Sequence, residues 1–138
     1  MAIKIYVDQG HNPENPNAGA EGNGLREQNI VYRIGQETAA LLRQSGNYEV
    51  RLSRPLPDTI LGTSNASSLR ARTEDANAWG ADYFISIHAN AFEGVASGCE
   101  AYSFPNDTQS IRMGKQILSA INALTQLKNR GMKDGSLL

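Results

Sequence analysis

Short apolar runs of high β-propensity alternate with segments of helical periodicity along the chain. The run at residues 3–7 is almost continuously apolar, which is typical of a strand buried on both faces of a sheet. Further strands are predicted at 48–52, 83–87 and 98–104. Because strands that alternate with helices pair through crossover connections, the sequence predicts an α/β fold. We expect one domain, residues 1–138, with a mostly parallel sheet and helices on both of its faces.

Three helices are predicted between these strands. The first spans residues 25–44, where apolar side chains recur on one face. The second is capped by Ser67 or Ser68, and the third by Asp107 or Thr108. These residue types suit the position because their side chains accept hydrogen bonds from the free amides of the first helical turn.

Two segments lack such periodicity. Residues 12–24 are rich in Asn, Pro and Gly and are predicted to form an irregular loop. Because this loop directly follows the first strand, we interpret it as part of a functional site rather than as a hinge. The tail at 129–138 carries no pattern that assigns it to a helix or a strand.

The amino-acid composition limits the classes of protein to which the chain can belong. With 40% hydrophobic and 20% charged residues, the chain is ordinary for one globular domain. Its net charge of −1 argues against a nucleic-acid-binding protein, which needs a basic face. A single cysteine, Cys99, excludes an internal disulfide. No apolar run approaches the ~20 residues of a membrane span, and the start turns polar by Asp8, so no signal peptide is predicted.

The two histidines of the chain, His11 and His88, each come just after a predicted strand. Because the carboxyl ends of parallel strands meet at one rim of a sheet, we expect the two imidazoles to lie close together. Two imidazoles and a carboxylate suit a catalytic zinc site with one open position. Glu27 is the best-placed carboxylate, with Glu14 and Glu21 as rivals. Spacing alone leaves open that both histidines are ordinary surface or core residues.

Other residues have simpler interpretations. Asp8 either holds the His11 imidazole through a hydrogen bond or forms a turn or a helix cap. Arg70 and Arg72 are predicted to lie on a solvated helical face. Cys99 is expected to be a small buried hydrophobe.

Six short motifs follow one another along the chain. They are Val-Asp-Gln-Gly-His at 7–11, Leu-Arg-Glu at 25–27, Arg-Leu-Ser-Arg at 51–54, Leu-Arg-Ala-Arg at 69–72, Ser-Ile-His-Ala-Asn-Ala at 86–91 and Arg-Gly at 130–131. In this order they resemble the zinc-dependent N-acetylmuramoyl-L-alanine amidases of the Amidase_3 family, and the likeness spans essentially the whole chain.

The resemblance implies a site and a reaction. It implies that His11, Glu27 and His88 bind Zn²⁺, and that the protein hydrolyses the amide bond between N-acetylmuramic acid and L-alanine in peptidoglycan. The partner is then peptidoglycan, and the protein is expected to be a monomer that acts at the bacterial cell wall, as an autolysin or an endolysin. Without a signal peptide, it would reach the wall by another route, unless a leader has been removed.

The sequence departs from the family pattern at one point. The catalytic glutamate of the family is expected on a strand after Arg130, in a Val-Glu-x-Gly-Phe-like segment, and the chain reaches Leu138 before one. We therefore expect a domain shortened at its C-terminus, without the last strand of the family fold and with its catalytic residue unknown. Glu100 is a weak candidate for this role; a solvent-facing strand residue is the alternative. A zinc-binding but non-catalytic peptidoglycan-binding module is the alternative function.

Overall fold

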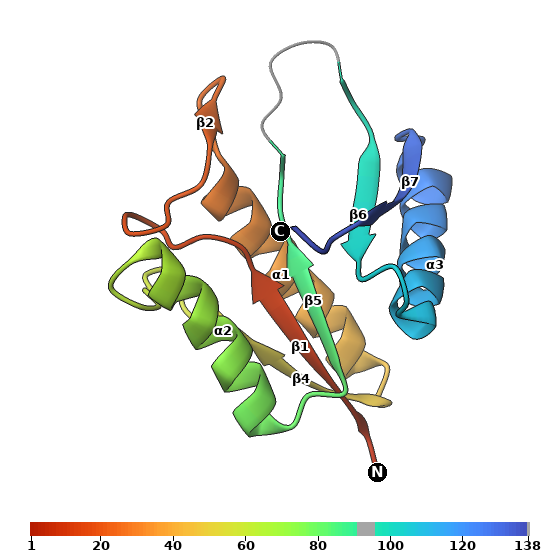
Figure 1. The fold of residues 1–138 in the computed structure, drawn as a ribbon, viewed down its shortest axis with the longest axis horizontal. Helices are drawn as coiled ribbons and strands as arrows, with labels where there is room; N and C mark the ends of the chain where they lie inside the picture. The colour runs from red at the N-terminus through yellow and green to blue at the C-terminus, as the bar shows by residue number, and fades with distance from the viewer. Residues whose placement is uncertain (91–95, 138) are drawn as a thin grey trace. The chain divides into compact units, whose positions relative to one another are not determined.

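The computed structural model describes residues 1–90 and 96–137. Ala91, the end of one sequence motif, and Leu138 lie outside the described residues. The chain divides into two compact units, Met1–Ala91 and Phe92–Leu138, each with its own strands and helices (Figure 1). The prediction of one domain over residues 1–138 stays a prediction.

The first unit is built on a parallel three-stranded sheet in the order β4-β1-β5. Its strands are β1 (Ile3–Gln9), β4 (Tyr48–Leu52) and β5 (Tyr83–Ile87). The predicted strands at 48–52 and 83–87 are confirmed to the residue, and β1 is two residues longer than predicted. The α/β class and the parallel pairing are therefore confirmed.

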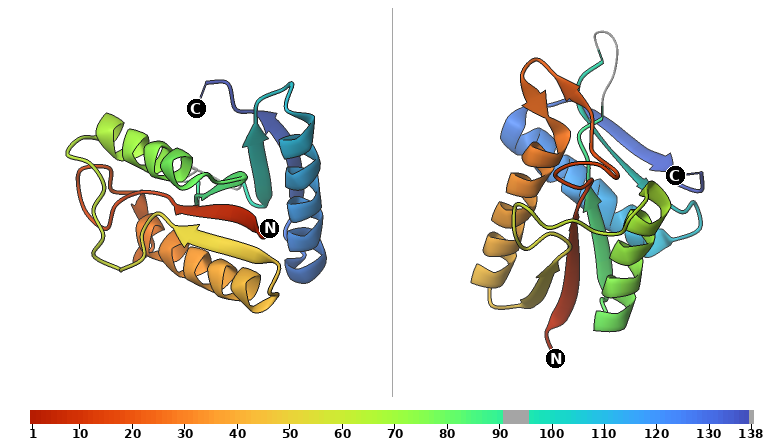
Figure 2. Two further views of the ribbon diagram at one scale, coloured as in Figure 1. Left: turned by 90° about the horizontal axis from the view of Figure 1, so that it is seen from below. Right: turned by 90° about the vertical axis from the view of Figure 1, so that its left-hand side faces the viewer.

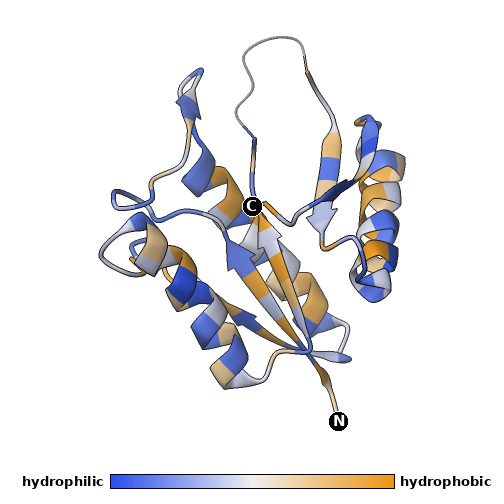
Figure 3. Ribbon diagram, viewed as in Figure 1, coloured by the Kyte–Doolittle hydropathy of each residue, from blue (hydrophilic) through white to orange (hydrophobic). Residues whose placement is uncertain are grey.

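The middle strand carries the core. Val7 pairs with Leu52 on one side and Ile85 on the other, and its side chain is fully buried. Along β1 the colouring changes from apolar to hydrophilic at the carboxyl end (Figure 3). The core cluster consists of Ile5, Val7, Ala39 and Leu52, with Leu42, Tyr48, Val50, Ile85 and Ile87 packed against it.

Two helices, α1 (Glu27–Gln44) and α2 (Asn65–Trp79), cover opposite faces of this sheet, as predicted (Figure 2, left). α1 packs on β1 and β4, whereas α2 is joined to β1 partly through polar contacts: the Tyr6 hydroxyl donates to Asp75 over 2.8 Å. Among the described residues, no helix combines the length and apolar composition needed to cross a membrane.

The start of α2 differs from the prediction. Ser64 is the N-cap: its side chain accepts a hydrogen bond from the amide of Ser67, and the Ser67 hydroxyl completes a capping box. Ser68 lies inside the helix, fully buried, and its hydroxyl accepts a hydrogen bond from Asn17. The prediction of Ser67 or Ser68 as the cap is thus wrong by one helical turn, because three serines in five residues all suit that position.

The segment before α1 also differs. Residues predicted as loop and as helix start form a small antiparallel hairpin, β2 (Glu21–Gly22) with β3 (Leu25–Arg26). Arg26 donates to the carboxylate of Glu21 over 2.7 Å across this hairpin. The helix accordingly begins at Glu27, two residues later than predicted.

The second unit contains β6 (Cys99–Ser103), α3 (Thr108–Thr125) and β7 (Asn129–Asp134). β6 and β7 pair in parallel and α3 packs on both. Asp107 caps α3, as predicted, by accepting from the amide of Ser110 over 2.9 Å. β7 lies in the tail that the sequence left unassigned.

Cys99, at the start of β6, is only partly buried. Its thiol points to the carbonyl oxygen of Lys128 at 3.7 Å. The expectation that Cys99 is a buried hydrophobe is wrong. It is the first residue of β6, and the two-stranded sheet of β6 and β7 offers it few neighbours.

Candidate metal centre

Three predicted residues meet at the carboxyl rim of the parallel sheet. His11 follows β1, His88 follows β5, and Glu27 is the first residue of α1. Nε2 of His11 lies 3.2 Å from Nδ1 of His88, and Oε1 of Glu27 lies 3.3 Å from each of these nitrogens. The topology therefore brings together side chains that are up to 77 residues apart.

The triangle of donor atoms has the dimensions of a metal site. Ligand atoms bound tetrahedrally to zinc, at ~2.0–2.1 Å, are separated from one another by about 3.3 Å. The three observed distances, 3.2, 3.3 and 3.3 Å, match this value. Among the described residues, this is the one cluster of His, Cys, Asp or Glu side chains with metal-binding spacing. The rivals Glu14 and Glu21 are exposed and are not members of it.

Glu27 is held in place by the backbone. Its Oε1 accepts a hydrogen bond from the amide of Ala89 over 2.9 Å, and its Oε2 accepts one from the amide of Ala20 over 3.3 Å. The carboxylate is buried, with 8% exposure, and lies at the positive end of the α1 dipole. These contacts hold the carboxylate with its Oε1 pointing at the two imidazoles.

The loop at 12–24 belongs to this site, as predicted. Gly19 passes so close that an added β-carbon would lie 2.9 Å from Cβ of Glu27 and 3.0 Å from Cδ2 of His11. Only a residue without a side chain allows the loop to pack there. The loop thus packs directly against two of the three side chains.

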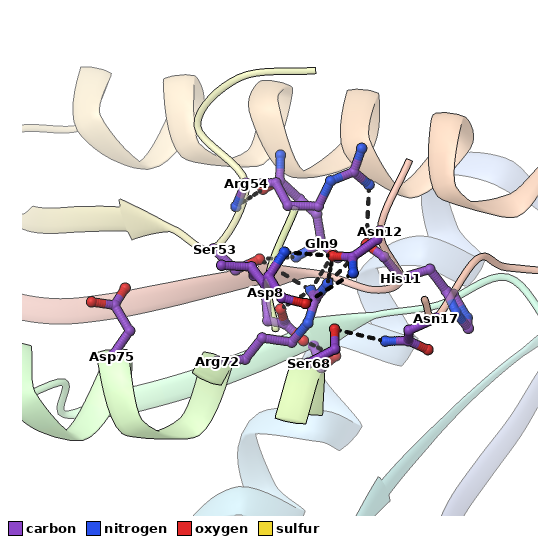
Figure 4. A network of polar contacts seen from close by, with 12 residues as sticks. Asp8, Gln9, His11, Asn12, Asn17, Ser53, Arg54, Ser68, Arg72 and Asp75 are labelled. Atoms are coloured by element: carbon purple, nitrogen blue, oxygen red, sulfur yellow. Dashed lines mark hydrogen bonds and ion pairs between the residues drawn. The ribbon is translucent and has the colours of Figure 1, made fainter. Parts of the chain in front are cut away.

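The structure corrects the interpretation of Arg72. Arg70 is exposed as predicted, but Arg72 is 2% exposed and forms a buried ion pair with Asp8, Nη1 to Oδ1, at 2.7 Å (Figure 4). Its Nη2 donates to the backbone carbonyl of His11 over 2.9 Å. A helical residue of this type is usually solvated, whereas here the buried carboxylate on β1 requires a cation.

Both interpretations of Asp8 are also wrong. Its carboxylate does not bind the imidazole of His11; it accepts hydrogen bonds from Arg72 and from the Ser86 hydroxyl, the latter over 2.6 Å. It lies inside β1 and forms neither a turn nor a helix cap. The sequence did hold a signal for the burial of a basic residue such as Arg72, because a carboxylate in a strand buried on both faces needs a basic partner.

A second buried arginine completes the network behind His11. Arg54 is 1% exposed and donates to the carbonyl oxygens of Gln28, over 3.0 Å, and His11, over 3.3 Å. The side chain of Gln9 accepts from the backbone amide of Arg54. Burial, and then the positive charge of Arg72, lower the pKa of the Arg54 guanidinium.

Glu100, the candidate catalytic residue, lies on β6 in the second unit. Its carboxylate accepts hydrogen bonds from the Tyr102 hydroxyl over 2.8 Å and from Nε of Arg130 over 3.2 Å. The Tyr102 hydrogen bond, followed by the charge of Arg130, lowers the pKa of Glu100. Its catalytic role stays a prediction.

The fold and the rim site define an α/β protein with a candidate metal centre made of two imidazoles and one carboxylate. Residues 5–138 match the family model Amidase_3, described as N-acetylmuramoyl-L-alanine amidase, and the chain belongs to this family.

Named relatives agree with this assignment. The chain is 36% identical to N-acetylmuramoyl-L-alanine amidase CwlM of Bacillus licheniformis, over 95% of this chain and 48% of that protein. It is 37% identical to the sporulation-specific N-acetylmuramoyl-L-alanine amidase of Bacillus subtilis, over 75% of this chain and 37% of that protein. The chain thus spans about half or less of these two relatives.

Solved structures show the same fold. The crystal structure of N-acetylmuramoyl-L-alanine amidase from Clostridium difficile 630 superposes with a TM-score of 0.84 at 25% identity, over 97% of this chain and 70% of that one.

Proposed function

We propose that this chain is a zinc-dependent N-acetylmuramoyl-L-alanine amidase, which hydrolyses the bond between N-acetylmuramic acid and L-alanine in peptidoglycan. The observation that carries the proposal is the evenly spaced triangle of His11, Glu27 and His88 in a chain of this family. These residues would hold the zinc ion. When bound, zinc supplies a Lewis acid that polarises the scissile carbonyl and activates water.

The chain's own groups prepare this site. Glu27 contributes the negative charge that offsets part of a divalent cation, and the amides of Ala89 and Ala20 fix its two oxygens. His11 directs Nε2, and His88 Nδ1, to the same point. One carboxylate and two neutral imidazoles form a donor set that favours zinc over the all-oxygen sites of magnesium or calcium.

Proton delivery to the leaving nitrogen requires a further acid. Glu27 is the one carboxylate in the described cluster and is used as a ligand. We retain Glu100 as the candidate, although the lowered pKa of its carboxyl makes it a weaker base and leaves it less often protonated. A peptidoglycan-binding module that holds zinc without turnover is the alternative outcome of the test.

The test measures zinc content and bond cleavage on the same preparation. We expect one zinc per chain by elemental mass spectrometry, and release of stem peptides with a free N-terminal alanine from purified peptidoglycan. Chelation should abolish the release, and added zinc should restore it. His88→Ala should lose both zinc and activity, whereas Asn77→Ala, at an exposed position on α2, should keep both. Zinc retained by His88→Ala would refute the ligand set, and zinc without cleavage would refute the enzymatic function.

The partner and localisation follow from the same proposal. We propose peptidoglycan as the macromolecular partner and the bacterial cell wall as the place of action. The monomeric state stays a prediction, which sedimentation equilibrium of the purified chain can test.

A further inference from the structure

We propose that Arg72 and Arg54 are positioning residues for His11, an inference that rests on the proposed zinc site. Both guanidinium groups donate to one acceptor, the backbone carbonyl oxygen of His11, over 2.9 Å from Arg72 and 3.3 Å from Arg54. Both side chains are almost fully buried. The two guanidinium groups occupy both lone pairs of this carbonyl oxygen with charged donors, which fixes the orientation of the His11 backbone.

The backbone of His11 needs such support. Its φ angle is 65°, in the left-handed region that residues other than glycine rarely adopt. In this conformation the imidazole Nε2 lies 3.3 Å from Glu27. Charge-assisted hydrogen bonds to the carbonyl stabilise the turn that directs the ligand to its partners.

Arg72 holds the chain on both sides of His11. Before it, Nη1 binds Asp8 at 2.7 Å and the carbonyl of Gln9 at 2.6 Å. After it, Nη2 contacts Oδ1 of Asn12 at 3.3 Å. A single planar group therefore fixes the path from the end of β1 into the loop (Figure 4).

Asn12 anchors the far side of this turn. It is fully buried, and its side chain exchanges two hydrogen bonds with the backbone of Leu61, donating over 2.9 Å and accepting over 3.0 Å. Its backbone amide donates to Asn17 over 2.9 Å. Because Asn12 is anchored independently of the arginines, loss of their contacts should change mainly the segment before it, which includes His11.

Arginine and lysine differ in the directions in which they donate hydrogen bonds. The guanidinium fork donates in several fixed directions, whereas an ammonium is a point charge. Arg72→Lys keeps the charge beside Asp8 but does not also span the His11 carbonyl. The matched control is Arg51→Lys, because Arg51 binds Asp75, on the same helix α2, with Nη2 to Oδ1 at 2.7 Å in an exposed pair.

The experiment measures metal affinity and ligand geometry in the full chain. Zinc Kd is obtained by competition with a chromophoric chelator, and the visible spectrum of the Co²⁺-loaded protein reports ligand geometry. Loss of a group that orients a ligand typically weakens metal binding ~10–100-fold. We expect a loss of this size with an altered Co²⁺ spectrum for Arg72→Lys, a smaller loss for Arg54→Lys, and wild-type values for Arg51→Lys.

Thermal unfolding of each metal-free variant identifies a temperature at which that variant is folded. All zinc affinities are measured at such a temperature, so a weaker Kd reports a change at the metal site rather than loss of the fold. Wild-type Kd and an unchanged Co²⁺ spectrum in Arg72→Lys would overturn the inference and leave the proposed function intact. Absence of zinc binding by the wild type would instead overturn the zinc site itself. If Arg72→Lys does not fold, the same measurement on Arg54→Lys decides whether the positioning inference holds.

Discussion

Gly10 lies directly against the imidazole of His88. A β-carbon at position 10 would overlap with Cε1 and lie 2.7 Å from Nδ1 of that ring. Nδ1 is the atom that lies 3.3 Å from Oε1 of Glu27. The Gly10 amide also donates to the carbonyl of Ile87, so the ends of β1 and β5 are joined beside the proposed ligands. The glycine before His11 therefore makes room for the other histidine.

Gly10→Ala should displace His88. We expect a roughly 10–100-fold weaker zinc Kd, and a loss of about 1–3 kcal/mol in the free energy of unfolding from overpacking. Chelator competition and thermal unfolding measure the two effects. Gly22→Ala is the control, because nothing lies within 4 Å of a β-carbon added there. Wild-type affinity in Gly10→Ala would contradict the close packing.

Asp8→Asn should be strongly destabilising. The substitution leaves the buried Arg72 without its carboxylate, and breaking a buried ion pair costs ~3–5 kcal/mol. Arg51→Gln breaks the exposed pair with Asp75 and should cost only ~0.2–1 kcal/mol. Denaturant unfolding of both variants gives the comparison. Equal losses would mean that burial does not set the energy of the Asp8 pair.

The hydroxyl of Tyr6 should make stability depend on alkaline pH. Burial, and then its hydrogen bond to Asp75, raise the pKa of Tyr6 above its ordinary value. The folded protein therefore keeps the phenolic proton more tightly than the unfolded chain does. This stabilisation is complete below pH ~10 and is lost as the pH rises further. The stability difference between wild type and Tyr6→Phe, measured from pH 8 to 11, should shrink above pH ~10; a constant difference would refute this.

Ser64→Ala should weaken the start of α2. It removes the acceptor for the Ser67 amide, and loss of such a cap costs ~0.5–2 kcal/mol. Asn65→Ala changes the next, exposed residue and should stay within ~0.5 kcal/mol of wild type. Urea unfolding distinguishes the two. A larger effect at Asn65 would place the cap elsewhere.

The meeting of His11, Glu27 and His88 could be predicted because it depends on topology. Once β1 and β5 are assigned as parallel strands, the residues after them, His11 and His88, must share a rim. Glu27 follows from its place at the start of the next helix. Apolar runs between polar breaks identified these strands. Strand positions are therefore the structural feature that this sequence indicates most clearly.

The groups that support the triangle could not be predicted in the same way. Arg72 shares its helix with exposed Arg70, and α2 has little apolar periodicity to show which side faces the sheet. Its burial depends on a partner, Asp8, that is 64 residues away. β7 was missed because its sequence, Asn-Arg-Gly-Met-Lys-Asp, is mostly polar, and its pairing with β6 rests on backbone hydrogen bonds.

The central place of β1 has a consequence for how the chain folds during synthesis. Tyr6 pairs with Arg51 and Phe84, so β1 is synthesised before both of its neighbours. At ~5–20 residues per second, the second neighbour follows several seconds later. Parallel pairing over such separations closes large loops and is slow. His88 comes after the last strand of this sheet to be synthesised, so the nascent chain does not have all three proposed metal ligands until the sheet can close.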